Sequence, residues 1–357
     1  MSKESKTMEK EAKAKAVAKQ PWTAQRVLDT ILNNALIIIM IIAVIYIAIV
    51  NKNFLKAASI INILAQTCAY LPVALGVGGC IVLTGTDLSA GRIVGLTACI
   101  SASLLQAVDA ASKMWPNLTP PPVLLVLLLA MVIGGAIGAF NGFFVAKYKL
   151  HPFIVTLATQ LIIYTILLLY VKAGENNGMA ISGLDKSYSS FITGSLLKIG
   201  GTPIPNYVWI AVICTALMWF IWNKTTFGKN MFALGANEEA ARVSGVNVFA
   251  TNIMVFALAG AMYAVTGFIE GARVASNTAN TGLNYESDAI AACVIGGVSF
   301  VGGIGKIRGI VIGVLMLRLI FVGLNMIGIN QDLFYIIKGG IILFACALDM
   351  RKYLVKR

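Results

Sequence analysis

The sequence predicts an all-α, polytopic transmembrane helical bundle of about ten spans, with both termini in the cytoplasm. The composition, the spacing of the apolar runs and the placement of the basic residues support this fold class. Of the 357 residues, 58% are hydrophobic and 12% are charged, and the mean hydropathy is +0.84. Soluble domains have about 25% charged residues, so this composition excludes an ordinary soluble enzyme.

The apolar runs predict ten helices, because one span needs about 20 residues. The run at 287–301 is the shortest and is a candidate for a half-span or a broken helix. Together the helices form a membrane domain over 31–350, between a Lys-rich cytoplasmic tail at 1–30 and a basic cytoplasmic tail at 351–357. We expect the helices near residues 33–50, 60–84, 92–112, 121–146, 153–173, 207–223, 251–271, 287–301, 308–328 and 332–349.

The net charge of +13 is distributed as in a membrane protein. Seven basic residues lie in the first 26 positions and four in the last seven, where Lys and Arg hold segments on the cytoplasmic side. With the N-terminus inside, 19 of the 28 basic residues are internal and seven external, and only Arg318 and Lys338 fall within spans. The asymmetry predicts an even number of spans. No nucleic-acid partner is expected, because the sequence shows no basic face with interleaved aromatic residues.

The sequence has no pattern typical of an enzyme or of a metal site. Its six cysteines lie in apolar stretches without a C-x-x-C pair, and His151 is the only histidine, which excludes His-pair zinc sites. The glycine-rich stretch at 296–309 departs from the Walker spacing, since position 300 is Phe and Lys306 is followed by Ile307. We expect no enzymatic activity, no metal and no cofactor in this chain.

Two segments between spans are long enough to carry function. The expected external loop at 174–206 is rich in Gly and Pro, and it suits contact with an external partner. The internal segment at 224–250 is the most polar stretch between the two tails. Both are therefore candidate surfaces for partner proteins.

A short helix is predicted within the internal segment. Asn237 suits the N-cap, Glu238 and Glu239 are acids in the first turn, and Gly245 ends the element. Such a two-turn helix either inserts into a groove on a soluble partner or simply connects two spans. The residues by themselves leave both interpretations open.

Asp87 stands between two apolar runs, with hydroxyl residues on either side. A charged residue at membrane depth is costly and usually faces protein or water. In the preferred interpretation Thr84, Asp87 and Ser89, together with Ser299, lie on a solute pathway. In the alternative, a salt bridge from Asp87 to Arg92 ties two helix ends together.

Four motifs connect these observations to a known family. They are G-T-D-L-S-A-G-R at 85–92, F-G-K-N-M-F-A-L-G-A-N-E-E-A-A-R-V-S-G-V-N-V at 227–248, D-A-I-A-A-C-V-I-G-G-V-S-F-V-G-G-I-G at 288–305 and I-I-K-G-G-I-I-L-F-A-C-A-L-D at 336–349. Together they resemble the permease subunits of bacterial ABC sugar importers that handle ribose, xylose, arabinose and galactose. Within that subgroup the likeness is nearest to the galactose/methyl galactoside branch.

The resemblance implies a homodimeric permease in the bacterial inner membrane that translocates a monosaccharide, with galactose, methyl galactoside and glucose foremost. ATP and Mg would bind to a separate ATPase subunit, and a periplasmic or lipid-anchored binding protein would deliver the sugar. Rocking of the two halves would then give alternating access. The residues assigned to ATPase coupling are Gly235, Asn237, Glu238, Glu239, Ala240, Arg242 and Gly245.

Two rival functions stay open at this point. The same architecture could carry another small solute, such as a pentose or a nucleoside. A self-sufficient channel or secondary carrier would need ion-coupling carboxylates within spans, for which Asp87, Asp288 and Glu270 are the candidates. Arg318 falls in mid-span, so it either lines the bundle interior or marks an error in the span boundaries.

Overall fold

Ten apolar helices form the body of the structure, one at each predicted span. The structure is a computed structural model that describes residues 35–330 and 332–354, so the predicted tail at 1–30 and the last residues of the tail at 351–357 lie outside it. Within these ranges the ten helices are α3 (Ala35–Val50), α4 (Ala57–Val82), α5 (Ala90–Leu104), α6 (Val123–Tyr148), α7 (Pro152–Lys172), α9 (Tyr207–Lys224), α12 (Val248–Val274), α13 (Tyr285–Ile295), α14 (Ile307–Ile327) and α15 (Leu333–Leu354).

Six of the described helices, α4, α6, α7, α9, α12 and α14, are long and apolar enough to cross a membrane. The prediction of a polytopic helical protein is therefore confirmed. Two helices are shorter than predicted, since α13 covers 11 residues and α5 ends at Leu104 instead of near 112. The chain turns there because the Gln106 side chain accepts a hydrogen bond from the Met114 amide (2.8 Å) and donates to the carbonyl oxygens of Ser112 and Ser182.

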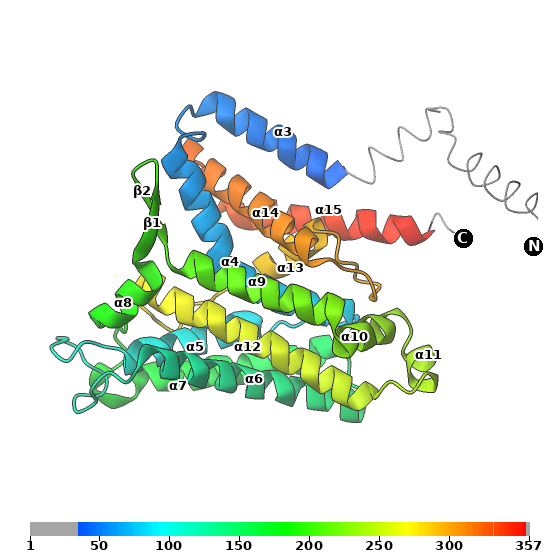
Figure 1. The fold of residues 1–357 in the computed structure, drawn as a ribbon, viewed down its shortest axis with the longest axis horizontal. Helices are drawn as coiled ribbons and strands as arrows, with labels where there is room; N and C mark the ends of the chain where they lie inside the picture. Colours follow the sequence, from blue (N-terminus) through cyan, green and yellow to red (C-terminus); the bar gives the residue numbers. More distant parts are fainter. Residues whose placement is uncertain (1–34, 331, 355–357) are drawn as a thin grey trace, which may run out of the picture.

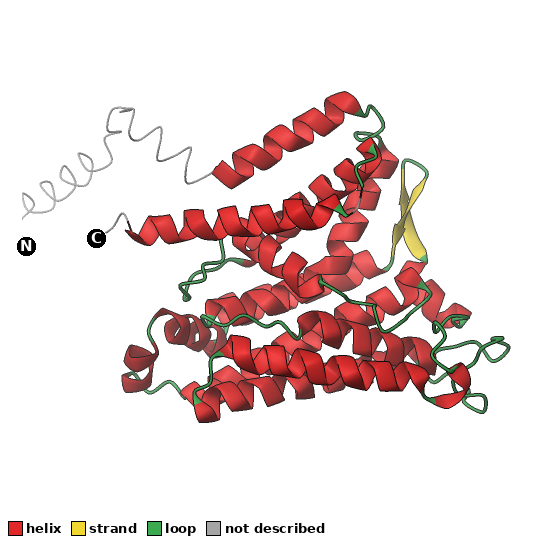
Figure 2. Ribbon diagram, turned by 180° about the vertical axis from the view of Figure 1, so that it is seen from behind, coloured by secondary structure: helices red, strands yellow, loops and turns green. Residues whose placement is uncertain are grey.

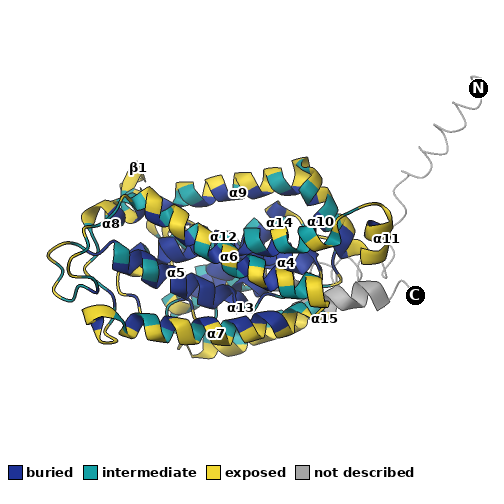
Figure 3. Ribbon diagram, turned by 90° about the horizontal axis from the view of Figure 1, so that it is seen from below, coloured by how far each residue is buried: buried dark blue, intermediate teal, exposed yellow. Residues whose placement is uncertain are grey.

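Helix α4 lies at the centre of the bundle. In Figure 1, α5, α6, α7 and α12 lie on one side of it, and α3, α14 and α15 lie on the other. Helix α4 contacts α9, α12, α13 and α14, and it is buried without interruption from Leu71 to Val82. Burial is concentrated along this central region in Figure 3, whereas the outer faces of α6, α7 and α9 carry many exposed residues.

Helices α6 and α12 cross at glycines. A Cβ atom on Gly260 would lie 2.0 Å from the Gly134 carbonyl oxygen, and one on Gly138 would lie 2.0 Å from the Phe256 carbonyl oxygen. Small residues let membrane helices approach until their backbones touch, which gains dispersion contacts where lipid supplies no hydrophobic drive. This crossing fixes α12, whose other faces pack on α4 and α5.

The connections gather at two ends of the bundle. One end carries α10 (Thr226–Ala236) and α11 (Glu238–Val243), and α3 begins and α15 ends on the same side (Figure 1). The opposite end carries η1 (Gly174–Asn176), α8 (Lys186–Thr193) and an antiparallel hairpin of β1 (Ser195–Ile199) and β2 (Thr202–Pro205), drawn in yellow in Figure 2.

The predicted external loop at 174–206 thus contains a short helix and also a hairpin that was not predicted. Its turn is Gly200-Gly201, with both residues at positive φ, and a glycine pair of this kind is a recognised hairpin signal. Helix α8 begins at Asp185, whose carboxylate accepts hydrogen bonds from the Ser187 hydroxyl and amide. These bonds hold the pKa of Asp185 below its ordinary value. The buried Tyr188 hydroxyl donates to the Phe268 carbonyl oxygen (2.5 Å), which anchors the segment on α12.

The glycine crossing predicts a stability effect. We expect Gly260→Val to lower the melting temperature of the detergent-purified protein by about 1–4 °C, because overpacking costs about 1–3 kcal/mol. Gly135→Ala is the matched control, since its Cβ would stand 3.5 Å from the Ala257 carbonyl oxygen, an ordinary contact. Equal melting temperatures for the two variants would contradict the proposed close approach.

Candidate coupling surface and solute cavity

Helices α10 and α11 form an angled pair between α9 and α12. The Thr225 hydroxyl accepts a hydrogen bond from the Gly228 amide (3.1 Å) and begins α10. The Asn237 side chain accepts from the Ala240 amide (3.0 Å) and begins α11, and Gly245, at φ +85°, follows its end. The short helix capped by Asn237 is therefore present as predicted. Helix α10 was not predicted.

The outer surface of α11 is charged and open to solvent. Arg242 forms ion pairs with Glu238 (2.6 Å) and Glu239 (3.6 Å), and the Glu239 side chain is 78% exposed. Val243 is 89% exposed, which is unusual for an apolar side chain at the end of an ordered helix. Sequence reasoning missed Val243, because an isolated Val carries no signal until its exposure is known.

The seven residues assigned to coupling divide into two groups. Gly235 is buried, whereas the other six are exposed. The exposed group surrounds α11 and forms one continuous candidate surface, which we call the α11 surface. It consists of Asn237, Glu238, Glu239, Ala240, Arg242 and Gly245.

Two of the motifs found in the sequence, those at 227–248 and 288–305, meet the end of α4 beneath α10. We call this contact the glycine junction; it is formed by Val82, Thr84, Gly235, Gly302 and Gly303. The Gly303 amide donates to the Val82 carbonyl oxygen (2.9 Å), and a Cβ on Gly235 would lie 1.8 Å from that same oxygen. A Cβ on Gly302 would lie 2.3 Å from the Thr84 methyl group and 2.4 Å from the Gly235 carbonyl oxygen. The backbone of α10 at Gly235 therefore lies directly against the backbone of Val82 and Gly303, with no side chain between them.

Asp87 lies in a closed hydrogen-bond network. Its carboxylate accepts from the Ser89 amide (2.9 Å), the Ser89 hydroxyl (2.6 Å) and the Tyr263 hydroxyl (3.2 Å). Asn141 donates to the Ser89 hydroxyl (3.0 Å) and accepts from Thr159 (2.6 Å). The network joins α6, α7 and α12 to the segment before α5, and all five side chains are buried.

The salt bridge offered as an alternative for Asp87 is absent from the described residues, so that interpretation is wrong. The Arg92 guanidinium instead donates to the Ala279 carbonyl oxygen (3.2 Å) and lies 4.1 Å from the centre of the Tyr164 ring. Arg92 thus contacts an aromatic ring and a backbone carbonyl group, while the Asp87 carboxylate accepts its hydrogen bonds from hydroxyl and amide groups.

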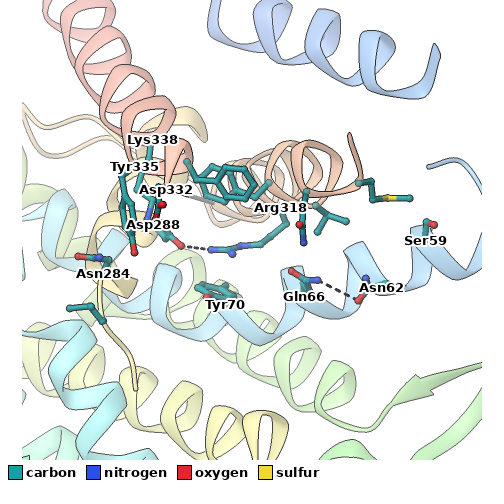
Figure 4. Close-up of a pocket in the computed structure, with 16 residues that line it drawn as sticks. Ser59, Asn62, Gln66, Tyr70, Asn284, Asp288, Arg318, Asp332, Tyr335 and Lys338 are labelled. Atoms are coloured by element: carbon teal, nitrogen blue, oxygen red, sulfur yellow. Dashed lines mark hydrogen bonds and ion pairs between the residues drawn. The ribbon is translucent and has the colours of Figure 1, made fainter. Parts of the chain in front are cut away.

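A polar cavity of about 560 Å³ lies between α4, α13, α14 and α15 (Figure 4). It occupies the half of the bundle toward the hairpin end, since the first part of α4 and the last part of α14 line it. Its lining residues are Ser59, Asn62, Gln66, Tyr70, Leu283, Asn284, Asp288, Arg318, Phe321, Val322, Asn325, Met326, Asp332, Phe334, Tyr335 and Lys338.

Three buried charges from three helices meet in this cavity. Asp288 of α13 pairs through one oxygen with Arg318 of α14 (2.6 Å) and through the other with Lys338 of α15. The Arg318 guanidinium lies 3.4 Å from the centre of the Tyr70 ring on α4, and Tyr70 stacks on Tyr285. Arg318 therefore lines the bundle interior, the first of the two explanations for its mid-span position.

None of the four residues predicted on the pathway lines this cavity. Thr84 and the buried Ser299 lie at the glycine junction and in its adjoining loop, toward the α10 end, where the Ser299 amide donates to the Ile304 carbonyl oxygen (3.1 Å). Asp87 and Ser89 belong to the closed network. The placement of these four on a solute pathway stays a prediction.

This architecture is that of a multi-pass membrane transport protein, with a short exposed helix at one end and a charged cavity toward the other. Residues 59–346 match the family model described as "Branched-chain amino acid transport system / permease component". The chain belongs to this permease family. No solved structure matches it.

Several relatives are named as sugar import permeases. The galactose/methyl galactoside import permease MglC of Salmonella typhimurium is 45% identical over 90% of this chain and 94% of its own length. The Haemophilus influenzae MglC is 42% identical over 92% and 97%, and the Escherichia coli ribose import permease RbsC is 33% identical over 88% and 93%. The resemblance to ABC sugar-importer permeases is confirmed.

The closed network around Asp87 predicts a stability effect. We expect Asp87→Asn to lower the melting temperature of the purified protein, because an amide NH₂ would meet the Ser89 and Tyr263 donors in a buried site. Uptake should fall in parallel with stability. Lost uptake at an unchanged melting temperature would instead place Asp87 on the solute pathway.

Proposed function

We propose that the chain is the transmembrane permease subunit of an ATP-driven importer of the bacterial inner membrane, and that its solute is a monosaccharide, with galactose and methyl galactoside first. The identity of 45% with a galactose/methyl galactoside permease over nearly the full length of both chains carries this proposal. The charged α11 surface supports it, because a permease without its own nucleotide site must contact an ATPase.

The proposed topology has ten spans and both termini in the cytoplasm. Its support is that α3 begins and α15 ends at the end of the bundle that carries α10 and α11 (Figure 1). The surplus of Lys and Arg in the segments assigned to that side agrees, since positively charged loops stay in the cytoplasm. Helices α5 and α13 are then the two shortest spans, with 15 and 11 helical residues.

ATP-driven motion would enter through α11 and α10. The ATPase subunit binds ATP and Mg, and a groove on it holds the α11 surface together with the exposed Val243. Movement of α10 passes directly into Val82 at the end of α4, and into Gly302 and Gly303 before α14, because these backbones are in contact. Packed elements of this kind move as rigid bodies.

Two further partners are proposed, a sugar-binding protein at the end opposite to α11 and a second copy of the chain beside the bundle. A periplasmic or lipid-anchored sugar-binding protein would meet the segment that contains α8 and the hairpin. A second copy of the chain would complete the central pathway. Thr84 and Ser299 are proposed to lie along its inner part, with Asp87 and Ser89 bracing its wall from inside the bundle, and the polar cavity opens its outer part.

A pentose is the second candidate solute, favoured by the ribose import permeases among the relatives. An ion-coupled carrier finds less support. Of the carboxylates considered for it, Asp288 is shared by two cations and Glu270 forms a bidentate ion pair with Arg273 (2.9 and 2.8 Å). Such pairing leaves neither of these two carboxylates open to a coupling ion, and Asp87 is held by hydroxyl and amide donors.

Charge reversal on the α11 surface tests the proposal. We expect Glu239→Lys to abolish ATP-dependent uptake and to lower co-purification of the ATPase at least about tenfold, with the permease still folded, because Glu239 is exposed. Asp109→Lys, an exposed charge reversal outside both candidate partner surfaces, is the matched control. Normal uptake by Glu239→Lys would exclude α11 as the docking element.

A further inference from the structure

The cavity between α4, α13, α14 and α15 has the size of a small-molecule site. Its volume of about 560 Å³ lies within the usual range of about 300–1,000 Å³ for ligand pockets. Figure 4 shows side chains from both ends of the cavity directed into one space, with the Asp288–Arg318 ion pair at its centre. A buried charge cluster in a membrane bundle points to function, because it is costly to maintain.

The charges around the cavity cancel. Two carboxylates, Asp288 and Asp332, face two cations, Arg318 and Lys338. Asp288 already binds both cations, so neither cation is left as an unpaired partner for a charged solute. A zwitterionic amino acid or a sugar phosphate would have to break these pairs, whereas a neutral molecule with many hydroxyl groups would not.

Hydrogen-bonding capacity remains unused. The Nε atom of Arg318 is buried and has no hydrogen-bond partner among the described residues. A buried donor left without a partner costs about 1–3 kcal/mol. The side-chain amides of Asn62 and Gln66, which share one long hydrogen bond (3.4 Å), and that of Asn325 also line the space. These groups match hydroxyl groups that both donate and accept.

Aromatic rings supply apolar walls. The ring of Tyr70 is covered on one face by the Arg318 guanidinium and on the other by Tyr285. The aromatic wall left for a ligand is therefore the pair Phe321 and Phe334, stacked with ring centres 5.6 Å apart. The two faces of a pyranose ring carry C–H groups, which pack on aromatic rings. Polar donors and acceptors beside flat apolar faces suit a monosaccharide.

We infer that this cavity is a binding subsite for a neutral monosaccharide within the permease itself, with Arg318 as its central hydrogen-bond donor. The inference rests on the proposed function and deepens it. The subsite receives the sugar on the hairpin side of the bundle before the path opens toward α10. Asp288 and Lys338 hold Arg318 in place and keep the site neutral.

Direct sugar binding to the permease tests this inference. Purified wild-type chain in lipid nanodiscs is mixed with methyl β-galactoside, and saturation-transfer NMR measures contact between protein and sugar. Arg318→Gln removes the central donor. Arg92→Gln is the matched control, because Arg92 is also buried and stacked on a tyrosine (4.1 Å from the Tyr164 ring centre) but does not line the cavity.

The expected result is a saturation-transfer signal in the wild type and in Arg92→Gln, and a loss of affinity of at least about tenfold in Arg318→Gln. Arg318→Lys keeps the charge but loses the planar fork, so we expect an intermediate loss. No wild-type signal, or equal signals from Arg318→Gln and Arg92→Gln, would overturn the inference and leave the three charges as a structural brace.

Competition in the wild type gives a test that does not depend on the folding of a variant. Excess galactose should displace methyl β-galactoside, while leucine and galactose 6-phosphate should not. Displacement by leucine or by the sugar phosphate would contradict a neutral, fully paired site.

Uptake into proteoliposomes separates this inference from the proposed function. With the ATPase and the binding protein present, ATP-driven uptake by a wild-type chain that shows no direct sugar signal would remove the subsite and keep the importer. Sugar binding to the chain without ATPase association or ATP-driven uptake would remove the importer and keep the subsite.

Discussion

The direct backbone contact beneath α10 is the constraint on which the α10–α11 end of the bundle depends. Gly235 touches the last carbonyl of α4 at Val82, and Gly302 and Gly303 complete the contact from the loop before α14. A side chain at any of these glycines would separate α10 from the bundle. Because interfaces this tightly packed move as units and do not deform smoothly, a displacement of α11 has a rigid route into two membrane helices.

The polar groups inside the bundle are arranged in two different ways. Around Asp87 each buried side-chain oxygen and nitrogen atom has a hydrogen-bond partner, which makes the network a brace that holds α6, α7 and α12 in register with the segment before α5. Around Asp288 the charges are paired, yet Arg318 keeps an unused donor and a cavity lies beside it. A satisfied network stabilises one arrangement, whereas a paired cluster with an unused donor beside a cavity can bind a neutral solute without breaking its ion pairs.

Much of the fold was predictable, because hydropathy depends on local composition. All ten apolar helices occur where the runs placed them, and Asn237 caps a short helix as its residue type predicts. The predictions of helix bounds fail where contacts between distant segments or tertiary packing outweigh the local sequence preference. Helix α5 stops early because Gln106 binds backbone groups in a distant segment, and α10 escaped prediction because its glycines usually disfavour a helix.

The sequence by itself determined the class of this protein, the number of its apolar helices, the charged helix between two of them and the family to which it belongs, since each is written in composition or in a contiguous motif. Only the tertiary structure decided which polar residues act together. Asp288, Arg318 and Lys338 each stood out in the sequence as charges within apolar runs, but nothing local shows that three separate helices bring them to one cavity. Asp87 and Arg92 are neighbours in sequence that turn to different partners. Which side chains bind one another depends on which helix faces meet. Packing between residues far apart in the chain determines how those faces meet.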